Sequence, residues 1–480
     1  MNLRFFRQIF TDSVVYGGAD LLTKMLSFFT FPLLAAALSP KAFGVLDLII
    51  TITGLLGLFI NFGLNNAVSI YYWDVNTTNV TKPVIVTSGL VAQTCFGFLA
   101  IGIGLAVIPF ILPKIKILEL PITWVSLVAA LLFMAFSQWS QYILDVLRLH
   151  FAPWRFFLLA IITRVVSTFI GLIAVVRLSM GIDGLLLAQT IVLMLTVPLS
   201  LWMIRTDFKP ASIDYQWMKQ LVLTGYPYIY AGFAFWLFGS IDRWMLATMT
   251  SVEEVGIYSV AFRFASFVMF VSAAFGKASS PLAFKVKADH PQEYSTIYGD
   301  VLLLLIYVML LFGGGMALFS GEIINLLMPD EYLRSGLPLA ILCIGIVVQS
   351  TQQVTGIGIS LEKKTYLFGR LAWITAGLNF VLNWLLIPTY GATGSASAKL
   401  ISYLFLTGSY MYYTQQLHPV TVNWKRFMVL LAFFILITIV SIMFISESLV
   451  LSVFFSKVIF VAVSFLVVWR FLPIPSLKEI

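Results

Sequence analysis

The sequence predicts an all-α polytopic membrane protein with about fourteen transmembrane helices. The 480-residue chain is 60% apolar and only 10% charged, whereas roughly one-quarter of the residues in a soluble domain are charged. Its mean hydropathy is +0.98, and apolar stretches of about 20 residues, long enough to cross a hydrocarbon core, recur from end to end. The formal net charge of +8 then reflects basic residues retained on one side of a membrane, and no nucleic-acid partner is expected.

The apolar stretches are separated by short polar connections, which set the expected helices in order. The connections are too short to hold a domain outside the membrane. The fourteen expected spans cover residues 12–38, 43–71, 83–112, 122–147, 155–177, 184–204, 216–249, 255–284, 295–319, 337–360, 366–387, 392–413, 426–446 and 449–470.

Two short patterns occur twice and predict an internal repeat. Ser39, followed by Gly44, recurs as Ser251 followed by Gly256, and a glycine pair that begins at Gly181 recurs at Gly391. The offsets of 212 and 210 residues agree with a duplicated unit of about 210 residues. We expect two pseudo-symmetric six-helix bundles, residues 1–210 and 211–418, followed by the additional helices 13 and 14 in residues 419–480. Chance similarity between hydrophobic loops is the alternative interpretation.

The distribution of lysine and arginine predicts the orientation. Sixteen of them fall in the connections on one side, and five fall on the other side: Lys41, Lys114, Lys116, Arg177 and Arg334. The positive-inside rule therefore predicts that both termini lie in the cytoplasm. The first span resembles a signal peptide, but charged residues interrupt it, so we expect it to remain as a transmembrane helix.

Ionisable residues inside the spans are the candidates for function, because such groups are costly in lipid and normally face protein or water. The expected cations are Lys24, Arg164, Arg243, Arg263, Lys277 and Lys399, and the expected anions are Asp20 and Asp242. This excess of positive charge favours an anionic ligand in a water-filled cavity. Asp20 and Asp242 are also the candidates for ion coupling.

A structural interpretation of these charges stays open. Lys399 and Arg243 lie close enough to span ends for their side chains to reach the interface. Asp20 with Lys24, and Asp242 with a neighbouring cation such as Arg263, are candidates for purely structural ion pairs. Polar residues in several spans, among them Gln141 with Asp145 and the asparagines near Asn65, indicate either an interior path or hydrogen bonds between helices.

The sequence carries no enzyme signature. It contains no Walker A, GxSxG or HExxH motif and no cluster with metal-ligand spacing. We therefore expect no catalytic residue, no metal site and no cofactor.

The segment from Gly256 to Arg263, GIYSVAFR, with Pro281 beyond it, resembles the bacterial polysaccharide-export flippases when it is taken with the span count and the repeat. These belong to the multidrug/oligosaccharidyl-lipid/polysaccharide exporter superfamily and have a MATE-like fold. The resemblance covers nearly the whole chain and implies a V-shaped pair of bundles around a central cavity, in the bacterial cytoplasmic (inner) membrane.

The resemblance implies transport of a polyprenyl-pyrophosphate-linked oligosaccharide for surface polysaccharide biosynthesis, by alternating access. In this interpretation Lys24, Arg263 and Lys277 hold the pyrophosphate. The expected partners are the lipid-linked oligosaccharide, the bilayer and the polysaccharide polymerase machinery.

Two rival functions remain. A drug/cation antiporter on the same scaffold would suit a net acidic cavity. A membrane-embedded glycan polymerase or ligase would be a true enzyme, and such enzymes usually have a sizeable outer loop with catalytic groups. The longest outer loop here, residues 320–336, is short.

Overall fold

The computed structural model describes residues 22–23, 25–26, 29–74, 78, 81–117, 122–273, 275–276, 294–362, 364, 366–443 and 451–469. All regular secondary structure in these residues is helical. The chain divides into two compact units, unit 1 (Met1–Trp236) and unit 2 (Leu237–Ile480), and the division falls inside one long helix, α9.

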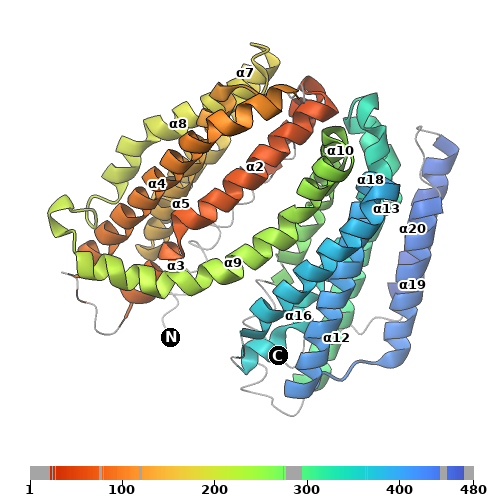
Figure 1. Ribbon diagram of the computed structural model, residues 1–480. Helices are drawn as coiled ribbons and strands as arrows, with labels where there is room; N and C mark the ends of the chain where they lie inside the picture. The colour runs from red at the N-terminus through yellow and green to blue at the C-terminus, as the bar shows by residue number, and fades with distance from the viewer. Residues whose placement is uncertain are drawn as a thin grey trace. The chain divides into compact units, whose positions relative to one another are not determined.

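Unit 1 is a bundle in which α2, α4, α5 and α8 lie side by side (Figure 1), with α5 packing against each of the others. Before α2, residues 29–37 are helical. The remaining elements are, in order, α2 (Pro40–Asn61), α3 (Leu64–Tyr72), α4 (Thr81–Ile117), α5 (Trp124–Leu149), α6 (Pro153–Ala160), η1 (Ile161–Val166), α7 (Ser167–Val176), α8 (Gly181–Met203), η2 (Pro210–Ser212) and α9 (Tyr215–Met249).

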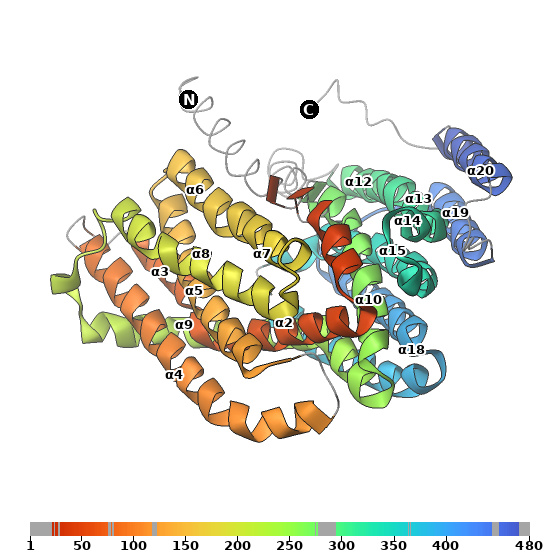
Figure 2. The same ribbon diagram turned by 90° about the horizontal axis from the view of Figure 1, so that it is seen from above.

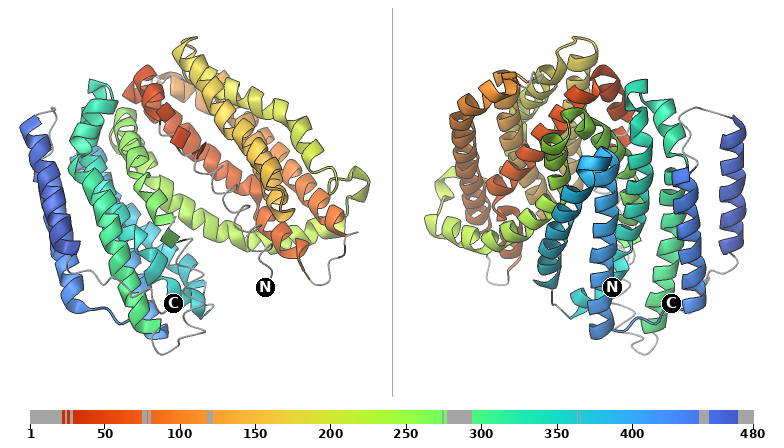
Figure 3. Two further views of the ribbon diagram at one scale, coloured as in Figure 1. Left: turned by 180° about the vertical axis from the view of Figure 1, so that it is seen from behind. Right: turned by 45° about the vertical axis from the view of Figure 1, so that its right-hand side comes forward.

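Unit 2 is built around α15, which packs against α10, α18 and α19 (Figure 2). The last two helices, α19 and α20, lie along one edge of the unit (Figure 3). Its elements are α10 (Val252–Ala265), α12 (Tyr294–Met309), η3 (Leu310–Gly314), α13 (Gly315–Leu318), α14 (Ser320–Leu327), η4 (Asp330–Ser335), α15 (Gly336–Ser350), α16 (Gln352–Thr355), α17 (Ile357–Leu361), α18 (Tyr366–Leu417), α19 (Trp424–Met443) and α20 (Leu451–Trp469).

The helices fit the predicted membrane spans. Among the described residues, 11 helices are long and apolar enough to cross a membrane. One of them, α18, contains two predicted spans, because its backbone leaves the helical conformation at Gly391. Helical residues 29–37 and helix α20 correspond to the first and last predicted spans. The protein is therefore an all-α polytopic membrane protein, and its helices fit the predicted count of about fourteen.

The two repeated sequence patterns adopt the same local structure in each unit. Ser39 caps α2 and Ser251 caps α10, each by accepting a hydrogen bond from the backbone N–H three residues later. Gly181 has φ of 58° and Gly391 has φ of 53°, so both adopt the left-handed conformation that favours glycine. Each pattern thus forms the same turn before a helix in both halves of the chain, which supports the predicted repeat.

Alternate connections meet at the same end of each unit, as successive membrane crossings require. In unit 1, Asp207 of the α8–η2 connection accepts a hydrogen bond from Tyr72, at the end of α3, and contacts His150, just beyond the end of α5. Burial alone raises the pKa of the Asp207 carboxyl, but the hydrogen bonds and charge interactions with His150, Tyr72 and Lys82 together outweigh that effect, and the pKa lies below its usual value. At the opposite end, Asp183 accepts hydrogen bonds from Thr123 and Ser126.

Unit 2 follows the same rule. Glu254, in the first turn of α10, contacts Arg334 and accepts a hydrogen bond from the backbone N–H of Ala392, which joins three connections at one end. At the other end, Ser295 donates a hydrogen bond to the carbonyl of Pro419.

Replacement of the two glycines with alanine separates backbone strain from crowding. At Gly181 a Cβ atom has nothing within 4 Å, so Gly181→Ala should destabilise the protein by roughly 1–2 kcal/mol through the left-handed backbone alone. At Gly391 the Cβ would also lie 2.5 Å from the Glu254 carboxylate, so Gly391→Ala should destabilise it more. The measurement is the thermal unfolding midpoint of the purified protein in detergent.

The matched control is Gly408→Ala. Gly408 lies in α18, and a Cβ atom added there has nothing within 4 Å. The substitution should therefore stabilise the protein by up to about 1 kcal/mol, because alanine favours a helix. Equal midpoints for the Gly181 and Gly391 variants would contradict the role assigned to the Glu254 contact.

Candidate functional site

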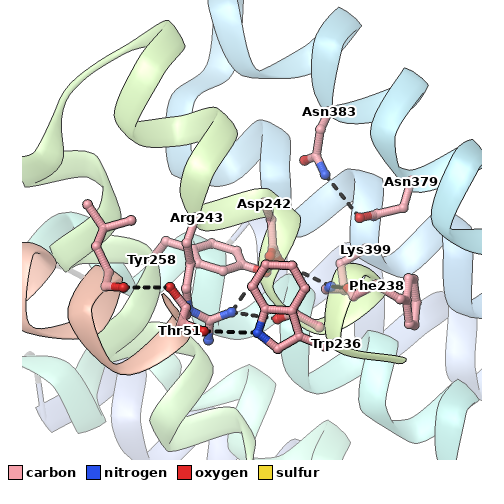
Figure 4. A network of polar contacts seen from close by, with 11 residues as sticks. Thr51, Trp236, Phe238, Asp242, Arg243, Tyr258, Asn379, Asn383 and Lys399 are labelled. Atoms are coloured by element: carbon pink, nitrogen blue, oxygen red, sulfur yellow. Dashed lines mark hydrogen bonds and ion pairs between the residues drawn. The ribbon is translucent and has the colours of Figure 1, made fainter. Parts of the chain in front are cut away.

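Unit 2 contains a buried cluster of charged residues centred on Asp242 of α9 (Figure 4). Asp242 and Tyr258 are fully buried, and Lys399 is 1% exposed. The Lys399 Nζ atom of α18 lies 3.1 Å from Asp242 Oδ2, and the Tyr258 hydroxyl of α10 donates a hydrogen bond to the same oxygen. One carboxylate therefore joins three helices of the unit.

The two cations of this cluster are held by further contacts. Lys399 Nζ also donates a hydrogen bond to the backbone carbonyl of Phe238 and lies 4.5 Å from the centre of the Phe238 ring. Arg243 Nη1 lies 3.6 Å from Asp242 Oδ1 and donates to the carbonyl of Gly239 at 2.7 Å. The Arg243 guanidinium also lies 4.8 Å from the Phe262 ring centre, a cation–π contact. The formal charges of Asp242, Lys399 and Arg243 sum to one positive unit.

Two buried amides extend the polar region along α18. Asn379 Nδ2 donates a hydrogen bond to Ser402 Oγ at 3.2 Å, and Asn383 Nδ2 donates to Asn379 Oδ1 at 3.1 Å. Both asparagines are fully buried. The chain of contacts ties the part of α18 before the Gly391 kink to the part after it.

Unit 1 contains a second polar chain, which crosses from η1 through α5 to α3. Arg164 Nη2 donates a hydrogen bond to Gln141 Oε1 at 2.9 Å, and Gln141 Nε2 donates to Asp145 Oδ1 at 3.1 Å. The other Asp145 oxygen accepts a hydrogen bond of 2.6 Å from Asn65 Nδ2. Arg164 lies in the π-helical segment η1, and such segments occur frequently at functional sites.

Arg164 lines a polar cavity in unit 1 of about 260 Å³. Gln141 lines the same cavity, together with side chains that carry hydroxyl or amide groups: Thr23, Ser137, Ser140, Thr163, Ser167, Thr168 and Gln189. A guanidinium surrounded by hydroxyls and amides is suited to an anionic or polyhydroxylated group.

The structure brings four of the eight predicted site residues into these two networks. Asp242, Arg243 and Lys399 form the cluster in unit 2, and Arg164 lines the cavity in unit 1. Arg263 is half-buried on α10, and the contacts of Asp242 in the described residues are with Lys399, Arg243 and Tyr258, not with Arg263. Asp20, Lys24 and Lys277 lie outside the described residues.

One buried ion pair was missed by the sequence analysis. Lys457 of α20 lies 2.6 Å from Glu322 of α14, and both side chains are about 95% buried. Lys457 also donates a hydrogen bond to the carbonyl of Leu318 at 2.9 Å. The signal was present, because Lys457 stands alone within an apolar run. This pair anchors α20 to the rest of unit 2.

The helical repeat and the charged groups buried among the helices define a multi-pass membrane protein built from repeated helical units. The chain belongs to the family described as polysaccharide biosynthesis protein, which matches residues 9–287. The family described as MatE also matches, over residues 227–385.

A curated relative is the probable low-salt glycan biosynthesis flippase Agl15 of Haloferax volcanii, which is 25% identical over 211 residues. That alignment covers 44% of this chain and 43% of the relative, so the chain matches less than half of the relative's length.

Solved structures with the same fold include two transport proteins. The inward closed conformation of the lipid II flippase MurJ gives a TM-score of 0.69 at 14% identity, over 95% of this chain and 98% of that one. An inward-facing multidrug resistance MATE family transporter of the MOP superfamily gives a TM-score of 0.59 at 14% identity, over 82% of this chain and 94% of that one. At this identity the similarity concerns the fold.

The ion cluster in unit 2 predicts that a single variant is less stable than the double variant that also removes a partner charge. Asp242→Asn leaves Lys399 and Arg243 buried without their carboxylate and should destabilise the protein by about 3–5 kcal/mol. Adding Lys399→Met should recover much of the loss, because one of the two uncompensated charges is removed. The measurement is the thermal unfolding midpoint in detergent, with the exposed Lys364→Met as the control. A double variant no more stable than Asp242→Asn would contradict the pairing.

Proposed function

We propose that the protein is a flippase that moves a polyprenyl-pyrophosphate-linked oligosaccharide across the cytoplasmic membrane for surface polysaccharide biosynthesis. The observation that carries the proposal is the Arg164 cavity in a member of the polysaccharide biosynthesis protein family. Its hydroxyl, amide and guanidinium groups match the hydrogen-bonding groups of a glycan and the charge of a pyrophosphate. The relative Agl15 carries the name of a glycan biosynthesis flippase, which agrees with this substrate class.

An apolar groove supports a substrate with a lipid tail. Unit 2 has a cavity of about 840 Å³ that is lined by side chains of α12, α15, α18 and α19, among them Leu302, Val347, Leu404 and Phe434. Most of its lining is hydrocarbon, so a polyprenyl chain can lie there without desolvating polar groups.

The transport step is expected to be alternating access without covalent chemistry, as in repeat-built transporters. The pyrophosphate is assigned to the cations Lys24, Arg164, Arg263 and Lys277. Arg243 and Lys399 add positive charge to unit 2, and Asp20 and Asp242 are the candidates for ion coupling. The polymerase machinery is the expected recipient of the transported glycan.

A second candidate function is drug or cation antiport, because residues 227–385 match the MatE family. Cells that express the protein would then survive higher concentrations of a lipophilic cation such as ethidium. Unchanged ethidium resistance together with restored glycan export supports the flippase.

The role of Arg164 is tested by export of surface glycan in cells that lack the native gene. Arg164→Ala should abolish export, because the guanidinium is lost from the cavity. Arg164→Lys should retain part of it, because a point charge remains but the planar, two-pronged donor is lost.

Arg177→Ala is the matched control, because Arg177 is an exposed arginine just beyond the C-terminal end of α7 in the same unit. The amount of each variant in the membrane is measured by immunoblot. Full export by the Arg164→Ala protein would remove this cavity from the transport path.

The proposed orientation places the basic connections of both units in the cytoplasm. In a version of the protein with Cys95→Ala, a cysteine at the exposed Glu253 position should react with an impermeant thiol reagent in intact cells. A cysteine at the exposed Lys364 position should react only after permeabilisation. The reverse labelling pattern would invert the orientation and the direction of transport.

A further inference from the structure

A second polar pocket lies at the end of unit 1 where α3 and α5 terminate. It has a volume of about 250 Å³ and is open to the outside of the unit. Its lining includes Asn65, Asn66, Asp145 and Arg148. Under the proposed orientation this end faces the cytoplasm, where a lipid-linked glycan is first available.

The pocket offers both hydrogen-bond donors and hydrogen-bond acceptors. Asp145 accepts bonds from Asn65 and Gln141, and Arg148 Nη1 lies 3.5 Å from the same carboxylate. Asn65 Oδ1 is buried and has no hydrogen-bond partner among the described residues. Asn66 is exposed on α3. Such a mixture suits hydroxyl groups, which donate and accept at once, whereas the Asp145 carboxylate disfavours phosphate.

Two aromatic rings complete the pocket. Trp73 is 55% exposed and Phe151 is 62% exposed, and their ring centres lie 5.9 Å apart. The Lys82 Nζ atom lies 4.2 Å from the Trp73 ring centre and holds that ring from one side.

The backbone conformation of Phe151 indicates that its ring is held at the edge of the pocket, where a ligand can contact it. Phe151 has φ of 52°, a left-handed conformation at the end of α5 where glycine is usual. A large apolar residue adopts it rarely. The ring stands exposed beside a polar pocket instead of packing into the core. Binding sites commonly join aromatic surface to a few convergent polar groups in this way.

We propose that this pocket binds one sugar ring of the glycan, with its hydroxyls on Asp145, Asn65 and Asn66 and its C–H face against Trp73 or Phe151. The proposal rests on the flippase function and adds a recognition site for the saccharide. The volume of about 250 Å³ is below the roughly 300–1,000 Å³ of sites for drug-sized ligands, and so it fits a single ring rather than an oligosaccharide.

The test measures binding of simple glycosides to the full-length protein in a detergent without a sugar headgroup. The probes are the methyl glycosides of glucose, galactose, mannose and N-acetylglucosamine at millimolar concentration, and the readout is saturation-transfer NMR. At least one glycoside should bind the unaltered protein. Trp73→Ala and Asn66→Ala should each weaken that binding by about tenfold, and Trp73→Phe should retain most of it.

Trp154→Ala is the matched control, because Trp154 is an exposed tryptophan of the same unit that does not line the pocket. Its binding should equal that of the unaltered protein. No transfer to any of the four glycosides would overturn the proposal. An equal loss in the Trp154→Ala protein would also overturn it.

Glycan export separates this proposal from the proposed function. Trp73→Ala should reduce export while Trp154→Ala preserves it. Normal export by a Trp73→Ala protein that no longer binds glycoside overturns the pocket's role and leaves the flippase intact. Glycoside binding in the expected pattern, with no export by the unaltered protein, refutes the flippase and supports the saccharide site.

Discussion

The hydrocarbon interior of a bilayer supplies no water, so a charged side chain at membrane depth needs a partner within the protein. This constraint accounts for the arrangement of Asp242 with Lys399 and of Glu322 with Lys457. Each pair joins helices that are distant in sequence, α9 with α18 and α14 with α20. Hydrophobic burial cannot select these neighbours, because lipid is as apolar as the helix surfaces. Ion pairs and hydrogen bonds therefore specify which helices meet.

The two units meet this constraint in different ways. In unit 2, Asp242, Lys399 and Arg243 form a compact cluster with direct contacts between opposite charges. In unit 1, the neutral amide of Gln141 stands between Arg164 and Asp145. A hydrogen bond to a charged group contributes about 1.5–3 kcal/mol, whereas removing one partner of a buried ion pair costs about 3–5 kcal/mol. A single hydrogen bond of the unit 1 chain is therefore less costly to exchange than the Asp242–Lys399 ion pair of unit 2 is to break.

Local features were predictable from the sequence because they depend on short stretches of chain. The caps at Ser39 and Ser251 and the turns at Gly181 and Gly391 follow from the types of residue at those positions. The helices also fit the predicted spans, because an apolar stretch of about 20 residues is long enough to cross the hydrocarbon core. The partners of the polar side chains were not predictable. Whether Asp242 meets Arg263 or Lys399 depends on how α10 and α18 rotate about their axes, which no single span records.

Gln141 gives the two polar pockets described above in unit 1 a physical connection. Its amide oxygen accepts from Arg164, which lines one cavity, and its amide nitrogen donates to Asp145, which lines the other. A ligand hydroxyl that donates to Asp145 shares the carboxylate with Gln141 and Asn65, because each carboxylate oxygen has two lone pairs and can accept more than one hydrogen bond. Because one amide group makes both contacts, a movement of Gln141 at the Asp145 end also moves the oxygen that Arg164 contacts. One glutamine on α5 therefore joins a saccharide pocket at the end of the bundle to a cationic cavity deeper within it.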